Sequence, residues 1–114
     1  MDSINLYNDK RMAMDKTEIL RTANEYITRD RQQTHGKAEN NFARISAMWS
    51  AYTGFNITPA DVAIMMAQLK MARFKHNPTY VDNAIDMAGY AALAGELGQA
   101  VDALKPASNR ATGE

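Results

Sequence analysis

Four segments with helical periodicity, joined by short breaks, constrain the fold of this 114-residue chain more than any other feature. Within each segment, apolar residues recur at spacings of three and four, which is the period of one helix face. The alternating β-branched pattern typical of strands is almost absent, and alanine, the best helix former, is abundant. The sequence therefore predicts an all-helical protein.

The helices are expected at about 16–31, 38–52, 59–75 and 80–104. Asp15 and Glu18 are spaced as a capping box for the first helix, and Thr58-Pro59 begins the third. Residues 15–104 are expected to form one domain, between a loose arm at 1–14 and a disordered tail at 105–114. The side chains expected in the core are Ile19, Ala23, Tyr26, Ile27, Phe42, Ile45, Trp49, Tyr52, Val62, Met65, Met66, Leu69, Ala72, Leu93, Leu97, Ala100 and Leu104.

Short connections favour antiparallel neighbours, so the expected architecture is an antiparallel four-helix bundle. In that topology, the end of the first helix, the start of the second, the end of the third and the start of the fourth meet at one pole. This pole would gather most of the chemistry-bearing residues: Asp30, Arg31, His35, Glu39, Lys70, Arg73, Asp82 and Asp86. Small residues between Ala88 and Gly95 would allow another helix or another subunit to approach the fourth helix closely.

Composition excludes several function classes. Thirteen basic residues balance thirteen acidic ones, so no overall field attracts nucleic acid or an anionic membrane. The chain has no cysteine, no apolar run long enough to cross a bilayer and no signal-peptide pattern, and we expect it in the cytoplasm. It also lacks a phosphate-binding glycine loop, an HExxH motif, a GxSxG motif and a basic recognition helix for specific DNA reading.

Asp82 and Asp86 lie on the same face of the fourth helix as Leu93 and Leu97. Carboxylates that continue an apolar stripe need a cation, a metal or a polar ligand, because an unpaired buried charge is costly. Asp82 has a second interpretation, since Thr79-x-x-Asp82 is also a capping-box spacing. Asp86 has no capping role; it would contact a ligand, pair with Lys70 or Arg73, or occupy a partly exposed edge.

The basic residues beside these acids leave alternatives open as well. Arg73 would be either a structural partner of the carboxylates or a phosphate ligand, because its planar fork suits both tasks. Mg²⁺ or Mn²⁺ is the natural partner of a carboxylate pair, and a polyphosphate is the natural guest beside Lys70 and Arg73. His35 is either the end of a loop or a ligand contact, and His76 is expected in a solvated loop.

The strings DVAxMMxxLKxAR (61–73) and DxxxDxAGY (82–90), with RQQTHG (31–36) and NFARISAMW (41–49), resemble a family of small phage and prophage proteins over about residues 17–98. That family is more distantly similar to all-α nucleotide pyrophosphohydrolases of the MazG type. In those enzymes, acids on two helices hold Mg²⁺ while water cleaves a nucleoside triphosphate to the monophosphate and pyrophosphate, commonly in dimers or tetramers. The ExxE pair typical of MazG-type enzymes is missing from this chain.

The resemblance implies a phage-encoded, MazG-like nucleoside triphosphate diphosphohydrolase that works as a homo-oligomer. Asp82 and Asp86 would hold the metal, and Asp30 or Glu39 would be an auxiliary ligand or the base. The substrate would contact four further residues: Lys70, Arg73, His35 and Tyr90. The missing ExxE favours an alternative, a non-catalytic module on the same fold that sequesters a nucleotide or engages a host protein.

Overall fold

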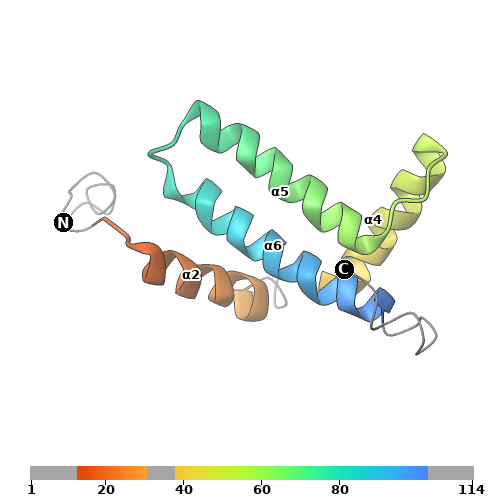
Figure 1. Ribbon diagram of the computed structural model, residues 1–114, viewed down its shortest axis with the longest axis horizontal. Helices are drawn as coiled ribbons and strands as arrows, with labels where there is room; N and C mark the ends of the chain where they lie inside the picture. The colour runs from red at the N-terminus through yellow and green to blue at the C-terminus, as the bar shows by residue number, and fades with distance from the viewer. Residues whose placement is uncertain (1–12, 31–37, 103–114) are drawn as a thin grey trace.

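A computed structural model describes residues 13–30 and 38–102, and the side chains of 13–29 and 41–99 within them. This part of the chain contains four helices and no strand, which confirms the predicted all-helical class. Residues 1–12 of the predicted arm at 1–14, Arg31, His35 and the predicted tail lie outside the described residues. The helices are α2 (Lys16–Glu25, continued by the π-helical turn η1, Tyr26–Asp30), α4 (Ala38–Thr53), α5 (Pro59–His76) and α6 (Val81–Asp102), as shown in Figure 1.

Side-chain caps begin two of these helices where the sequence predicts them. The carboxylate of Asp15 accepts a hydrogen bond from the backbone N–H of Glu18, 2.9 Å away. Thr58 and Asp61 form both halves of a capping box, at 3.0 and 2.9 Å. Such caps satisfy N–H groups that have no partner within the helix. The residue at which α5 begins, the helix that carries Lys70 and Arg73, is therefore fixed by its own first turn.

Helices α5 and α6 form an antiparallel hairpin, joined by residues 77–80 (Figure 1). The N–H of Asn77 still bonds to the carbonyl of Arg73, and the N–H of Asn83 bonds to the carbonyl of Tyr80. The short connection forces the chain to reverse, as the sequence predicts. As a result, the end of α5 and the start of α6 lie side by side.

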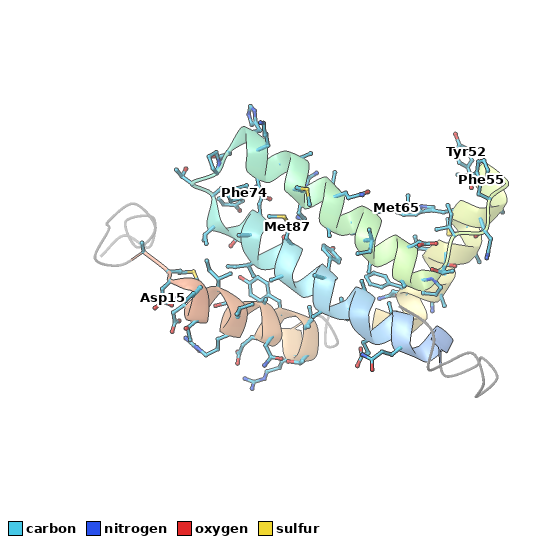
Figure 2. All side chains as sticks on the ribbon, viewed as in Figure 1. Asp15, Tyr52, Phe55, Met65, Phe74 and Met87 are labelled. Atoms are coloured by element: carbon cyan, nitrogen blue, oxygen red, sulfur yellow. The ribbon has the colours of Figure 1, made fainter. Side chains whose placement is uncertain are left out.

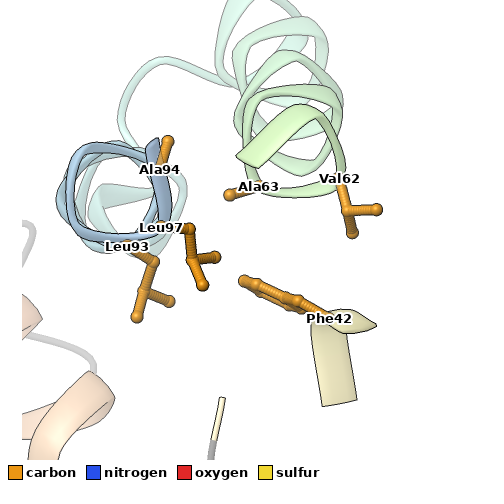
Figure 3. Packing of buried hydrophobic residues seen from close by; sticks show 6 residues of the cluster. All are labelled: Phe42, Val62, Ala63, Leu93, Ala94 and Leu97. Carbon is orange, nitrogen blue, oxygen red and sulfur yellow. The ribbon is translucent and has the colours of Figure 1, made fainter. Parts of the chain in front are cut away.

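The main core lies toward the other end of this hairpin, where α4 crosses it. Figure 3 shows the ring of Phe42 between the start of α5 and the second half of α6. The six buried residues of this core cluster are Phe42, Val62, Ala63, Leu93, Ala94 and Leu97. The hydroxyl of Ser50 accepts from the N–H of Ile57, which fastens α4 to the segment leading into α5. Helix α4 is thus anchored to the start of α5.

Helix α2 packs on α6 in the same direction, which corrects the expected up-and-down order. Met14 and Ile19, around the start of α2, line a small pocket together with Val81 and Ala84, at the start of α6. Further along, a Cβ added to Gly89 would lie 3.0 Å from Ile27 Cγ2. The two helices therefore run parallel (Figure 1), and the start of α2, not its end, lies beside the α5–α6 loop.

The predicted core is confirmed in part. Ala23, Phe42, Val62, Leu93 and Leu97 are buried, whereas Tyr52 is 92% exposed and Met65 and Leu69 are about two-fifths exposed. Figure 2 shows Tyr52 and Phe55 projecting from the tip of α4, away from the hairpin. Apolar periodicity marks a helix face, but the number of neighbouring helices decides how much of that face is covered. The side chains of Ala100 and Leu104 lie outside the described part.

Candidate functional site

A pocket of about 540 Å³ lies between α5 and α6 beside their connecting loop. This volume is within the range of small-molecule sites. We call it the loop pocket. Its walls combine three basic or potentially basic side chains with two carboxylates and two amides, and its lining is Leu69, Lys70, Ala72, Arg73, His76, Asn77, Tyr80, Asp82, Asn83 and Asp86. The sequence-predicted residues Lys70, Arg73, Asp82 and Asp86 are therefore brought together.

Lys70 and Asp86 form a direct ion pair in the loop pocket. The ammonium nitrogen of Lys70 lies 2.8 Å from a carboxylate oxygen of Asp86, and the two side chains are only 17% and 29% exposed. Because α5 and α6 are antiparallel, a residue two turns before the end of one helix faces a residue in the second turn of the other. Of the partners considered from the sequence, Lys70 rather than Arg73 pairs with Asp86.

Asp82 accepts a hydrogen bond from the phenol of Tyr80 at 3.1 Å. This bond, with the negative charge of Asp82, raises the pKa of Tyr80, because both favour the protonated phenol. The hydrogen bonds of the described residues include neither half of the capping box expected for Thr79 and Asp82; the Thr79 hydroxyl bonds instead to Asn77. The carboxylate of Asp82 therefore belongs to the pocket wall.

Arg73 is the cation with most freedom in this pocket. It is exposed, and within the described part of the chain its guanidinium makes no ion pair. His76 lies one turn further on α5 and is also exposed, so the loop position expected for it becomes the last turn of a helix at the pocket rim. Arg73 can therefore bind an incoming anion without first breaking a contact, whereas Lys70 is already paired.

Asn83 was not anticipated as a site residue. It is 6% exposed and is the one buried polar side chain among the described residues. It also lines the loop pocket, and no hydrogen bond of its side chain occurs within the described part of the structure. The sequence held a partial signal, because Asn83 lies three residues before Asp86 and shares its helix face. Its burial, however, depends on helix packing.

Three predicted site residues do not join this pocket. Ile27 lies beside Gly89, and α2 runs parallel to α6, so the backbone of Asp30 lies further along α6 than Gly89. At a rise of 1.5 Å per residue, this places Asp30 roughly 9 Å further along α6 than Asp86. Glu39 is one turn before Phe42 and therefore at the core end of the hairpin. The side chains of both acids lie outside the described part. Tyr90 packs against Phe42 instead, with ring centroids 6.3 Å apart.

The described side chains offer a limited metal site. Within them, no group of three or more histidine, aspartate or glutamate residues is placed to hold a metal ion. Asp82 and Asp86 both line the loop pocket, and two carboxylates are the set that Mg²⁺ uses when phosphates supply the remaining ligands. The donor set therefore fits a metal that arrives on a phosphate ligand better than one held by protein alone.

Comparison with known proteins gives a family. Residues 18–98 match the family described as "Domain of unknown function (DUF6378)". The chain belongs to this family. It is 47% identical over 76 residues to the Gene 55 protein of Mycobacterium phage L5, and 37% identical over 73 residues to the Gene 55 protein of Mycobacterium phage D29. The expected resemblance to small phage proteins is thereby confirmed.

These alignments cover 66% and 64% of this chain but 49% and 48% of the two phage proteins, so the chain spans about half the length of the relatives it matches. A search of solved structures found none that matches this chain. Among the described residues, no helix is both long enough and apolar enough to cross a bilayer. Both strings that carry the resemblance, at 61–73 and 82–90, lie within the matched region and supply most of the loop pocket.

Proposed function

We propose that this protein binds a nucleotide in the loop pocket as its Mg²⁺ complex. One observation carries the proposal: Lys70, Arg73, Asp82 and Asp86 line a single pocket of about 540 Å³. Arg73 would bind phosphate oxygens, and Asp82 and Asp86 would bind a magnesium ion carried by those phosphates. Two carboxylates beside a polyphosphate would otherwise repel it, so the metal supplies the charge balance.

Binding without turnover is supported more strongly than hydrolysis. A general base must lie within hydrogen-bond reach of the water that it activates. The two acids expected for this role, Asp30 and Glu39, have backbones away from the loop pocket, and Lys70 already occupies one side of Asp86. We therefore propose a nucleotide-sequestering protein acting in the bacterial cytoplasm.

The second candidate is the MazG-like diphosphohydrolase. Its support is the presence of Asp82 and Asp86 in one pocket, next to the cations that would bind the phosphates. One assay separates the two functions: the protein is incubated for a long time with Mg²⁺ and a panel of dNTPs, and the products are analysed by chromatography. Sequestration predicts tight binding and unchanged dNTP, whereas hydrolysis predicts monophosphate and pyrophosphate.

Calorimetric titration with Mg²⁺-dNTPs tests the site itself. Arg73→Ala is expected to weaken binding about tenfold, the effect of losing one charge-assisted contact. Asp86→Asn is expected to weaken the dependence of binding on Mg²⁺. Exposed residues of the same kinds provide matched controls, Arg44→Ala and Glu96→Gln, and both are expected to bind like the wild type. Equal affinities for Arg73→Ala and Arg44→Ala would contradict the site.

Assembly into a homo-dimer or tetramer is part of the same proposal. It is supported by exposed small residues on α6, Ala91, Ala92 and Gly95, and by Tyr52 and Phe55 at the tip of α4, which are 92% and 75% exposed. Exposed aromatic side chains beside one another are common at protein interfaces. Light scattering coupled to size-exclusion chromatography measures the mass, and a monomer at all concentrations would contradict this part.

A further inference from the structure

Asn83 has a buried side-chain amide that forms no hydrogen bond with the described residues. The residue is 6% exposed, and within the described chain no partner accepts from its side-chain NH₂ group or donates to its side-chain oxygen, although its backbone N–H bonds to the carbonyl of Tyr80. Burying an amide without hydrogen bonds is unfavourable, so such a group calls for a specific explanation. Asn83 lines the loop pocket, and a ligand in that pocket is the available partner.

The chemistry of the amide restricts what that partner is. An asparagine side chain offers a carbonyl acceptor and an NH₂ donor side by side. Its ideal partner carries a donor and an acceptor next to each other. The hydrogen-bonding edge of a nucleobase has this arrangement, whereas an inorganic polyphosphate carries acceptors almost exclusively. In the proposed site Arg73 binds the phosphates, and Asn83 does not add to that task.

We propose that Asn83 recognises the base edge of the nucleotide, so that the loop pocket selects nucleoside phosphates over bare polyphosphates. This inference rests on the proposed function, because it assumes that the pocket holds the phosphates. Tyr80 lies one turn before Asn83, lines the same pocket and is 54% exposed. Its ring is available to stack on a base whose edge Asn83 binds, as aromatic side chains do in nucleotide sites.

The arrangement divides base recognition and phosphate binding between α6 and α5. Asp82 and Asp86 are on either side of Asn83 in the sequence, and both are already partnered, by Tyr80 and by Lys70. Asn83 is the residue in this turn whose hydrogen-bonding capacity remains open among the described residues. Base recognition at Asn83 and phosphate binding at Arg73 therefore occupy different walls of one pocket, α6 and α5.

Titration of the full chain with Mg²⁺-dATP and with Mg²⁺ and inorganic triphosphate tests the inference. The wild type is expected to bind dATP at least tenfold more tightly than triphosphate. Asn83→Leu, similar in size but apolar, is expected to lose about tenfold in affinity for dATP with no change for triphosphate. Asn83→Ala is a second variant, which favours helix and retains the fold if leucine does not. The exposed Asn24→Leu is the matched control.

The outcomes distinguish this inference from the function on which it rests. A wild type that binds both ligands equally tightly, or variants that weaken both ligands to the same degree, overturn base recognition but leave the phosphate pocket intact. A wild type that binds neither ligand overturns the proposed function. Thermal unfolding gives an independent readout: removing an unsatisfied buried amide is expected to leave stability unchanged or raised, whereas a structural hydrogen bond would lower it.

Discussion

The two ends of the α5–α6 hairpin differ in the side chains between the helices, which are apolar at the core end and largely charged or polar at the loop end. At the core end, Phe42 of α4 packs against apolar residues of both hairpin helices, and Val62 and Ala63 have no exposed surface. At the loop end, the same two helices face each other through Lys70 and Asp86, and the space beside this pair remains open as the loop pocket. One end is filled and covered by α4, whereas the other, besides the side on which α2 packs, has a polar and accessible side.

Under the proposed function, this difference separates the part of the protein that stabilises the fold from the part that binds the ligand. Apolar burial at the core end stabilises the hairpin, since each fully buried valine, leucine or phenylalanine side chain contributes about 1.5–3 kcal/mol. That stability allows the loop end to keep the Asn83 amide and the Arg73 guanidinium, which pair with no side chain among the described residues; both add little to folding but are suited to a ligand. Variants that change one end at a time test this division.

The largest effect is expected at the core end. Phe42 is 1% exposed, and Phe42→Ala is expected to lower the free energy of unfolding by about 3–5 kcal/mol through lost burial and a cavity. Urea titration followed by circular dichroism measures the change. Met48, on the same helix but 67% exposed, is the matched control, and Met48→Ala is expected to change stability by less than about 0.5 kcal/mol. Similar losses from both variants would contradict the assigned core.

At the loop end, the Lys70–Asp86 pair is expected to contribute less. A double-mutant cycle with Lys70→Met and Asp86→Asn is expected to give a coupling energy of about 1 kcal/mol, because the pair is mostly shielded from water. Arg21 and Glu18 form an exposed pair within α2, with side chains 62% and 46% exposed, and their cycle is expected to give a few tenths of a kcal/mol. Equal couplings would mean that the loop pocket is as open to water as the surface of α2.

Most of the fold could be predicted from sequence where local signals decide it. The caps at Asp15 and Thr58 act within one turn, so the helix starts were predicted correctly. The loop between α5 and α6 is too short for anything but a reversal. The longer connection at 31–37 does not force one, and α2 therefore packs parallel to α6, a result of tertiary contacts such as Ile27 against Gly89.

The candidate site shows the same limit. Lys70 and Asp86 could be predicted because both lie near the short loop, on faces that antiparallel packing turns toward each other. Asp30 and Glu39 were assigned to the same pole by a topology that the structure does not adopt. Asn83 could not be predicted as a buried residue, because a polar residue in the first turn of a helix is usually solvated and only the packing around α6 removes it from water.

Two glycines of α6 differ in their surroundings: Gly89 lies against Ile27 of the neighbouring helix, and Gly95 has open space beside it. A Cβ at Gly95 would have no neighbour within 4 Å, so Gly95→Ala is expected to raise stability by about 0.5–1 kcal/mol through helix propensity alone. Gly89→Ala offers the same gain, but its Cβ would lie 3.0 Å from Ile27 and must displace it. We expect a smaller gain or a loss for Gly89→Ala in thermal unfolding. An equal gain at both positions would mean that α2 does not pack against Gly89.

The smallest expected effect is the titration of Tyr80 at the loop end. The hydrogen bond to Asp82, then the charges of Asp82 and Asp86, raise its pKa, and Lys70 partly opposes them. A tyrosine whose pKa is raised on folding adds stability below its unfolded pKa and loses it as the pH rises through the folded pKa. The difference in ultraviolet absorbance between wild type and Tyr80→Phe during alkaline titration isolates this phenol. Asp82→Asn is expected to move the midpoint of the Tyr80 titration to lower pH, whereas the exposed Glu96→Gln leaves it in place. A midpoint unchanged by Asp82→Asn would contradict the hydrogen bond between Tyr80 and Asp82.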